Sequence, residues 1–209
     1  MKRSDIQMPF DPPYGERAGS SPTLKFSEWY GQAKLKEKQD VSAVCLATAT
    51  RCGAPSCRMV LLKDFSESGF TFYTNAQSRK GCDIDDNPQA AMCFYWPECG
   101  LQIRVEGFVT NLNDAEADAY FNTRPLKSRI GAWASQQSRP LKDRSELMKR
   151  IAYYTAKWAT GNVERPPYWK GFRIVPDYFE FWGNGAYRIH ERHIYYLRDD
   201  DWYEAMLQP

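Results

Sequence analysis

Short runs of alternating, β-branched and aromatic residues, joined by tight turns, recur along this 209-residue chain and constrain its fold more than any other feature. Glycine-containing turns such as Arg51-Cys52-Gly53-Ala54 separate successive runs, which is typical of a β-meander. The predicted strands are 44–50, 57–63, 70–74, 91–96, 101–110, 172–175, 178–182, 187–197 and one after 199–201. Short strands joined as hairpins and interrupted by helices predict a mainly β fold with helices, in the form of a small closed barrel.

Helical patterns occur at four places, one before the first predicted strand and three between strands. The predicted helices are 24–38, a short one opening at 78–80 and ending before Pro88, one capped by Asn113 and stopped by Pro125, and 143–160. Residues 1–23 are rich in Pro, Gly and Ser and show no periodicity, which predicts a flexible N-terminal arm. We therefore expect a single domain over 24–209.

The composition excludes several classes of protein. A net charge of +2 argues against bulk binding of nucleic acid, and no apolar run is long enough to cross a bilayer. Six cysteines form no CxxC pair, and two histidines are too few to complete a zinc site with them, so we expect no metal. The first ten residues do not read as a signal peptide. An even number of cysteines also allows disulfides, but with no secretion signal we expect free thiols and a cytoplasmic location.

Several pieces of the sequence are suited to binding an anion. Ser78-Arg79-Lys80 opens a helix, where a hydroxyl, two cations and free backbone N–H groups converge. The strand 58–63 carries Arg58 and Lys63 at its ends, and Tyr120, Arg124 and Ser128 follow at a spacing of four. Each piece alone also fits an ordinary surface: a core strand with charged rims, or a helix end with a cationic last turn.

The segment 181–192 holds one of the two histidines between two arginines. If residues 187–197 form an extended strand, Arg188, His190 and Arg192 point to the same face. Two cations and an imidazole on one face favour an anionic ligand opposite them, and Trp182 could stack on a planar ring. A solvated basic edge strand explains the same pattern and remains open.

No glycine-rich dinucleotide or P-loop motif and no Ser/His/Asp nucleophile pattern is present. Instead, the chain resembles the pyridoxamine/pyridoxine 5′-phosphate oxidase family over roughly residues 40–209. The matching stretches, in family order, are RMVLLK (58–63), FYTN (72–75), SRKG (78–81), NP (87–88), FYW (94–96), YFNTRPLKSRIGAWAS (120–135) with QQS (136–138), PPYW (166–169), EFW (180–182) and RIHER (188–192). The resemblance implies an FMN-binding split β-barrel that forms a homodimer, with FMN at the subunit interface.

The resemblance also implies roles for individual residues. The implied FMN contacts are Arg58, Met59, Val60, Leu61, Leu62, Lys63, Tyr73, Thr74, Arg79, Lys80, Gln102, Gln137, Ser138, Trp182 and Arg192. The implied contacts to a phosphorylated pyridine substrate are Lys63, Tyr120, Arg124, Ser128, Arg188, Ile189 and His190, of which Arg188 and His190 would be catalytic. The implied reaction oxidises C4′ of pyridoxamine or pyridoxine 5′-phosphate to give pyridoxal 5′-phosphate, with O2 as acceptor and H2O2 as by-product.

The sequence departs from the family pattern at Lys170, at Gly183-Asn184 and at Met206, where Gly, Gln-Gly and Arg are usual. The sequence from Trp182 to Arg192 is similar to that of the flavin oxidases of phenazine biosynthesis. Those enzymes act on a non-phosphorylated tricyclic substrate. Lys63, Tyr120, Arg124 and Ser128 are retained, however, and suit a phosphorylated substrate. A third hypothesis is a non-catalytic flavin-binding or heme-binding split-barrel protein, against which the retained Arg188 and His190 argue.

Overall fold

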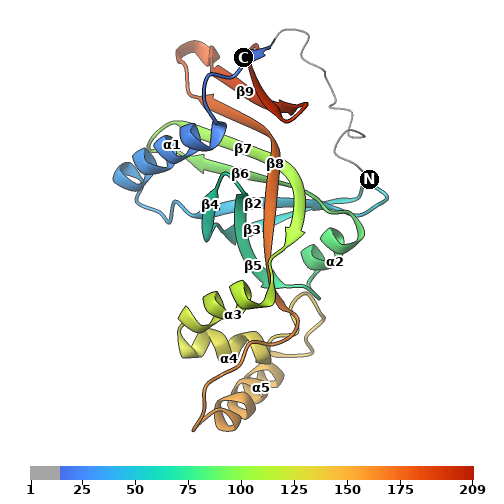
Figure 1. The fold of residues 1–209 in the computed structure, drawn as a ribbon. Helices are drawn as coiled ribbons and strands as arrows, with labels where there is room; N and C mark the ends of the chain where they lie inside the picture. The colour runs from blue at the N-terminus through green and yellow to red at the C-terminus, as the bar shows by residue number, and fades with distance from the viewer. Residues whose placement is uncertain (1–14) are drawn as a thin grey trace. The chain divides into compact units, whose positions relative to one another are not determined.

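The fold is that of a computed structural model in which residues 15–209 are described (Figure 1). The chain forms two compact units. The central unit consists of Ser42–Met92 and Gly107–Pro176, and the terminal unit consists of the residues up to Val41, Cys93–Glu106 and Asp177–Pro209. Most of the predicted arm, 1–23, lies outside the described residues, and the single domain over 24–209 stays a prediction.

The central unit is built around antiparallel hairpins. Strand β2 pairs with β3, with Val44 opposite Val60, and β5 pairs with both β4 and β8, where Phe72 lies opposite Phe172. The rings of Phe72 and Phe172 stack at 5.6 Å, and such a cross-strand pair contributes roughly 0.2–1 kcal/mol. The strands with residues in this unit are β2 (Ala43–Ala49), β3 (Pro55–Leu61), β4 (Asp64–Ser66), β5 (Gly69–Asn75), β6 (Gln89–Trp96), β7 (Leu101–Asn111) and β8 (Trp169–Gly183).

Glycine is required where the β4–β5 hairpin turns. Gly69 has a φ of 127°, and a Cβ built on it would lie 2.1 Å from the backbone oxygen of Ile174. Any other residue would both strain the backbone and collide with β8. This turn therefore helps to hold β5 in register against β8.

Helices α2 (Arg79–Asp86), α3 (Asp114–Thr123), α4 (Leu126–Ala134) and α5 (Arg144–Lys157) also belong to the central unit, where α3, α4 and α5 lie together (Figure 1). Phe121 of α3 and Ile130 of α4 form a core cluster with Val163 and Trp169, and Ile151 and Tyr154 of α5 pack against it. Burying each such side chain stabilises the fold by roughly 1.5–3 kcal/mol. The predicted caps are confirmed: Asn113 forms a capping box with Glu116, and the Ser78 hydroxyl accepts from the Gly81 N–H.

The terminal unit combines one helix with a small antiparallel sheet. Its elements are β1 (Glu16–Arg17), α1 (Pro22–Lys36), β9 (Glu191–Arg198) and β10 (Asp201–Met206), with parts of β6, β7 and β8. The strand order includes β1-β10-β9-β8. Phe26 of α1 is fully buried and packs edge-on against Phe94 at 5.1 Å, so aromatic contacts anchor the helix.

Three sequence expectations are wrong in detail. The separate strands predicted at 172–175 and 178–182 are one strand, β8, which continues through Pro176. Pro176 lies beside Gly107, where a Cβ would come within 2.8 Å of the Pro176 Cα, so the missing side chain makes room for the proline. Helix α4 was not predicted: the chain resumes a helix at Leu126, immediately after Pro125.

The third correction concerns the segment before β9. The strand predicted from residue 187 begins only at Glu191, because Tyr187 and Arg188 have positive φ angles of 56° and 65° within a 3₁₀ turn. The alternation of an extended strand does not apply there. Arg188 and Arg192 therefore do not share a strand face.

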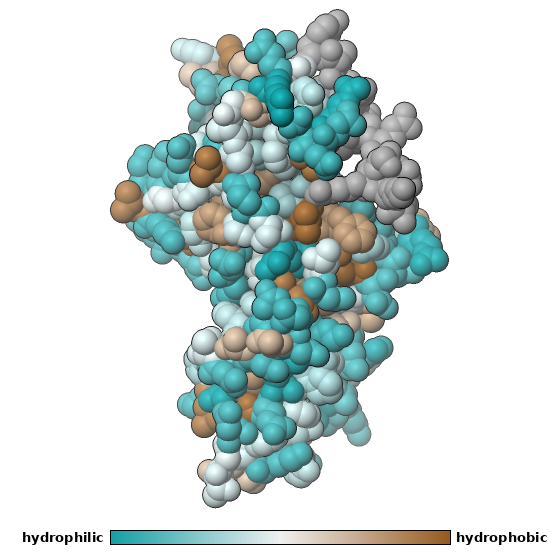
Figure 2. All heavy atoms as spheres, viewed as in Figure 1, coloured by the Kyte–Doolittle hydropathy of each residue, from teal (hydrophilic) through white to brown (hydrophobic). Residues whose placement is uncertain are grey.

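The surface seen in Figure 2 is mostly hydrophilic or neutral, with hydrophobic residues in small groups. Among residues 15–209, no helix is both long and apolar enough to span a bilayer. All six cysteines are free thiols, as expected.

Candidate functional site

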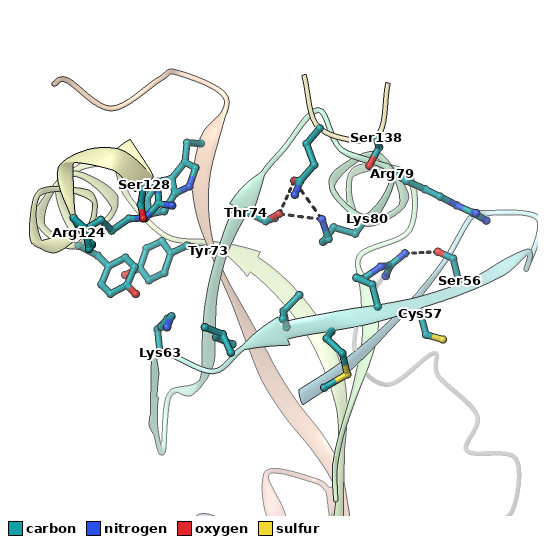
Figure 3. Close-up of a pocket in the computed structure, with 18 residues that line it drawn as sticks. Ser56, Cys57, Lys63, Tyr73, Thr74, Arg79, Lys80, Arg124, Ser128 and Ser138 are labelled. Carbon is teal, nitrogen blue, oxygen red and sulfur yellow. Dashed lines mark hydrogen bonds between the residues drawn. The ribbon is translucent and has the colours of Figure 1, made fainter. Parts of the chain in front are cut away.

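The central unit contains a pocket of about 800 Å³, drawn in Figure 3. Its size lies within the usual range for small-molecule sites. Among residues 15–209, five cationic side chains line it, and none of the lining residues carries a carboxylate. The lining residues are Ser56, Cys57, Arg58, Met59, Val60, Leu61, Lys63, Tyr73, Thr74, Arg79, Lys80, Tyr120, Arg124, Pro125, Ser128, Gln137, Ser138 and Trp169.

The cations form two groups on opposite sides of β5 (Figure 3). We name the first group the Arg58 end; it consists of Ser56, Arg58, Arg79, Lys80, Gln137 and Ser138. We name the second group the Arg124 end; it consists of Lys63, Tyr120, Arg124, Ser128 and the adjoining rings of Tyr73 and Trp169. The exposed side chains of Met59 and Leu61 supply apolar surface on β3.

Lys80 is the most buried cation at the Arg58 end, with 7% of its surface exposed. It lies in the first turn of α2, and its Nζ donates to Thr74 Oγ1 at 3.1 Å, to Ser78 Oγ at 3.1 Å and to Gln137 Oε1 at 3.4 Å. Burial lowers the pKa of Lys80, and the charge of Arg58 lowers it further. These acceptors are neutral, so an anion in the pocket would be a more favourable partner for the ammonium.

Arg58 is held on the other wall of this end. Its Nη1 donates to the backbone oxygen of Leu46 at 3.2 Å and to Thr48 Oγ1 at 2.7 Å, and its Nη2 donates to Ser56 Oγ. Burial lowers the pKa of Arg58, while the carboxylate of Asp83, 3.7 Å from Nη2, acts in the opposite direction. The guanidinium is therefore fixed in place before any ligand binds.

Arg124 at the other end has a different environment. It is the C-cap residue of α3, and its guanidinium carbon lies 4.9 Å from the ring centroid of Trp169 and 5.5 Å from that of Phe121. Its Nη1 is buried and has no hydrogen-bond partner within residues 15–209. Burial lowers the pKa of Arg124, with Tyr120 opposing the shift. A buried donor without an acceptor is costly, so this position favours a bound anion.

Three nearly parallel rings support the Arg124 end. The centroids of Tyr73 and Tyr120 lie 4.2 Å apart, and those of Tyr73 and Trp169 lie 5.1 Å apart, with interplanar angles of 12° and 9°. Burial raises the pKa of Tyr73, and the negative charge of Glu116 adds to this effect. The stack forms an apolar wall with phenolic groups at its edge.

Most of the predicted site residues of the central unit line this one pocket. Tyr120, Arg124 and Ser128 come together there because Pro125 ends α3 and α4 begins directly after it. Leu62 is the exception: it is 4% exposed and does not line the pocket.

The remaining predicted residues lie in the terminal unit and do not line the pocket: Gln102, Trp182, Arg188, Ile189, His190 and Arg192. Arg192 Nε donates to the buried carboxylate of Glu180 at 2.8 Å, and Nη1 donates to the Gln208 backbone oxygen at 3.0 Å. The rings of Trp182 and His190 lie 4.6 Å apart. Trp182 and His190 are therefore neighbours, whereas Arg192 is held by an ion pair.

Sequence reasoning missed four lining residues, namely Ser56, Cys57, Pro125 and Trp169, as well as the buried Asp83 beside the pocket. Trp169 was visible in the PPYW stretch but received no role. Asp83 could have been found from its spacing, since it follows Arg79 by four residues on α2.

Comparison with known proteins identifies similar chains. Residues 32–157 match the family described as pyridoxamine 5′-phosphate oxidase, and residues 169–209 match the pyridoxine 5′-phosphate oxidase C-terminal dimerisation region. A relative from Brucella anthropi named pyridoxine/pyridoxamine 5′-phosphate oxidase is 51% identical over 193 residues, covering 91% of this chain and 95% of that protein. A Brucella canis protein of the same name is 50% identical over the same coverage.

Solved structures agree with the fold. PhzG from Burkholderia lata, in complex with tetrahydrophenazine-1-carboxylic acid, has a TM-score of 0.86 at 31% identity and covers 98% of each chain. A pyridoxamine 5′-phosphate oxidase-related, FMN binding protein from Nostoc punctiforme has a TM-score of 0.71 at 18% identity, covering 91% of this chain and 99% of that one, and shows the fold alone. The predicted mainly β split-barrel fold is confirmed.

Proposed function

Because this chain belongs to the pyridoxamine 5′-phosphate oxidase family, we propose that it is an FMN-dependent oxidase that converts pyridoxamine 5′-phosphate or pyridoxine 5′-phosphate to pyridoxal 5′-phosphate. With the amine, O2 and water are consumed, and ammonia and H2O2 leave with the aldehyde. With the alcohol, O2 alone is consumed and H2O2 is formed.

The observation that carries this proposal is the pair of cationic ends in one pocket that no carboxylate of the described residues lines. A flavin mononucleotide and a phosphorylated pyridine each carry one phosphate, so their complex needs two separate anion sites. The Arg58 end and the Arg124 end supply one each (Figure 3). A phosphate-free substrate would need a phosphate site only for FMN, so the two cations Lys63 and Arg124 at the second end favour a phosphorylated substrate.

The residues at the Arg58 end fit FMN. Arg58, Arg79 and Lys80 would hold the single phosphate, with Gln137 and Ser138 as further polar contacts, and the N-terminus of α2 adds its own positive field. Thr74 and Tyr73 on β5 and Met59, Val60 and Leu61 on β3 would line the remainder of the cofactor site. When bound, FMN supplies the acceptor for a hydride from C4′ and passes the electrons to O2.

The Arg124 end would hold the substrate phosphate. Arg124 offers a buried donor without a partner in the described part of the chain, Tyr120 and Ser128 offer hydroxyls, and Lys63 adds a second charge. Binding of the phosphate at this end would fix the orientation of the substrate ring and its distance from the flavin. The residues that bind the phosphate would take no part in bond breaking. Such contacts act equally before and during the reaction, so they determine substrate affinity more than turnover.

We also propose a homodimer with residues from both protomers at each site. The match of 169–209 to a dimerisation region supports this, as do the predicted site residues that lie outside the pocket. Arg188 and His190 would orient C4′ and accept the proton that the amine or alcohol group loses as the hydride leaves C4′, and Trp182 and Arg192 would contact the flavin. Light scattering tests the dimer: a monomeric mass with flavin still bound would contradict it. A cytoplasmic location stays a prediction.

Oxidation of a phosphate-free tricyclic substrate is the second candidate, because the PhzG structure resembles this chain over nearly its full length. That substrate carries a carboxylate instead of a phosphate, and either anion can accept from the Arg124 Nη1 that has no partner within residues 15–209. The phosphate is favoured because Lys63, Tyr120 and Ser128 supply more charge and donors at this end than a single carboxylate needs. A non-catalytic flavin or heme protein would show binding without turnover.

One experiment separates these functions. The absorbance spectrum of the purified protein should show a flavin band, and chromatography of the released flavin should identify FMN rather than FAD. Anaerobic addition of pyridoxamine 5′-phosphate should bleach the band, whereas pyridoxamine at the same concentration should not. Bleaching by tetrahydrophenazine-1-carboxylic acid alone would favour the second candidate, and a heme spectrum or a flavin that no compound reduces would favour the third.

A further inference from the structure

Asp83 lies behind the pocket wall at the Arg58 end and is 5% exposed. It occupies the middle of α2, and its Oδ2 accepts hydrogen bonds from Thr48 Oγ1 of β2 at 2.7 Å and from Ser56 Oγ of β3 at 2.9 Å. The same two hydroxyl oxygens accept hydrogen bonds from the guanidinium of Arg58. Asp83 and Arg58 are thus joined through two hydroxyls that belong to different strands.

The direction of these bonds follows from what each group can do. An ionised carboxylate only accepts, so it takes the one proton of each hydroxyl and leaves the hydroxyl lone pairs for Arg58. Burial alone would raise the pKa of Asp83, but the hydrogen bonds from Thr48 and Ser56 and the charges of Arg58 and Arg79 lower it. Asp83 therefore stays ionised and keeps both hydroxyls in the orientation that Arg58 requires.

The network uses only some of the N–H donors of Arg58. Three of its N–H groups donate to Leu46, Thr48 and Ser56, out of the five that a guanidinium carries. Two N–H groups are not used by these bonds, and Arg58 lines the pocket. The network restrains the side chain, so less conformational entropy is lost when an anion binds.

We propose that Asp83 is a positioning residue for the FMN phosphate: through Thr48 and Ser56 it holds Arg58 in the orientation that binds this phosphate. The inference rests on the proposed function, because it takes FMN as the ligand of the Arg58 end. It assigns a role to a residue that does not itself line the pocket.

A purely electrostatic role for Asp83 makes the opposite prediction for FMN affinity. If Asp83 were only a buried negative charge near the pocket, removing that charge would make the pocket more positive and would tighten the binding of an anion. If Asp83 positions Arg58, Asp83→Asn weakens FMN, because the Asn amide can donate and reverse one of the two hydroxyls.

The test is a fluorescence titration of flavin-free protein with FMN and with riboflavin, which lacks the phosphate. Asp83→Asn should weaken FMN about tenfold, the size expected for one charge-assisted contact, and should leave riboflavin within about twofold of wild type. The matched control is Asp86→Asn, which removes the same charge from the same helix at an exposed ion pair with Arg51. This control should leave both affinities unchanged.

A double-mutant cycle tests whether Asp83 affects FMN affinity through Arg58. In an Arg58→Ala background, Asp83→Asn should change FMN affinity by less than about twofold, because the residue through which it acts is gone. If Asp83→Asn does not fold, Ser56→Ala removes one of the two linking hydroxyls and is judged by the same comparison of FMN with riboflavin.

The outcomes separate the inference from the proposed function. Unchanged or tighter FMN binding by Asp83→Asn, equal losses for FMN and riboflavin, or additive losses with Arg58→Ala would each overturn the positioning role while FMN binding by the wild type stands. Wild-type protein that does not prefer FMN to riboflavin would overturn the proposed cofactor site, and the inference with it.

Discussion

The two ends of the pocket use their cations in different ways. At the Arg58 end, Arg58 and Lys80 are already hydrogen-bonded to protein oxygens, and Arg58 also lies 3.7 Å from the carboxylate of Asp83. At the Arg124 end, the guanidinium lies against Trp169 and Phe121, and its Nη1 has no acceptor in the described part of the chain. The cations of the Arg58 end are therefore preorganised, whereas the Arg124 end keeps a hydrogen-bond donor without an acceptor in the described residues.

This difference suits two ligands that stay bound for different lengths of time. A preorganised end loses little entropy when its ligand arrives, which favours a cofactor that stays bound. An end with a buried, unpaired donor gains most from its ligand, which suits a substrate phosphate that must be recognised at every turnover. Mutations at the two ends should therefore separate cofactor affinity from substrate affinity.

The largest expected effect on substrate affinity is that of Arg124→Ala. The variant should raise KM for pyridoxamine 5′-phosphate by an amount equivalent to about 2–3 kcal/mol, with kcat and FMN content nearly unchanged. Steady-state kinetics and flavin absorbance measure both. Lys127→Ala, an exposed residue on α4, is the control and should have no effect. An unchanged KM in Arg124→Ala would place the substrate phosphate elsewhere and would favour the phenazine-type reaction.

Arg188 belongs to neither end and should behave differently from both. If it orients C4′, Arg188→Ala should lower kcat about a hundredfold, the loss expected for a misplacement of roughly 1 Å, and should also weaken substrate binding. FMN content should be unchanged, because no contact to FMN is proposed for Arg188. Stopped-flow flavin reduction with saturating substrate measures the step directly. Near-wild-type turnover with full flavin would refute the catalytic role.

Lys80 should make FMN binding sensitive to pH. Its pKa is lowered in the ligand-free protein, and the phosphate requires the protonated ammonium, so affinity should fall as the pH rises through that lowered pKa. The loss should reach at most about tenfold per pH unit, the limit for one proton. FMN titrations from neutral to alkaline pH measure it. Lys80→Arg should flatten the profile, since a guanidinium keeps its charge, and a persistent fall would exclude Lys80 as the cause.

The smallest expected effect is that of Trp169→Phe. A phenyl ring keeps part of the contact with Arg124, so KM for the phosphorylated substrate should rise by about two- to fivefold, equivalent to 0.5–1 kcal/mol of cation–π interaction. Trp169→Leu should raise KM further. FMN affinity should stay unchanged in both variants. If FMN affinity and substrate affinity fell equally, Trp169 would contribute only to the packing of the central unit and not to the position of Arg124.

The short-range features were predictable from the sequence because neighbouring residues determine them. Asn113 and Ser78 cap their helices as predicted, since a side-chain oxygen followed three residues later by a backbone N–H needs no distant partner. The order of hairpins followed from strand patterns and turn residues in the same way. The residues at both ends of the pocket were found through their resemblance to a family, and each cationic piece alone had fitted an ordinary surface equally well.

Two kinds of feature were not predictable from the strand and helix patterns: one tight local turn and the contacts made by tertiary packing. The turn at Tyr187 and Arg188 adopts positive φ angles where alternation predicted a strand, and Gly185 makes this close return possible, since a Cβ there would lie 1.7 Å from the Ile189 oxygen. Thr48, Ser56 and Asp83 meet around Arg58 only because β2, β3 and α2 pack together. A sequence determines which groups can donate, accept or carry charge, but packing between distant segments determines which of them become partners.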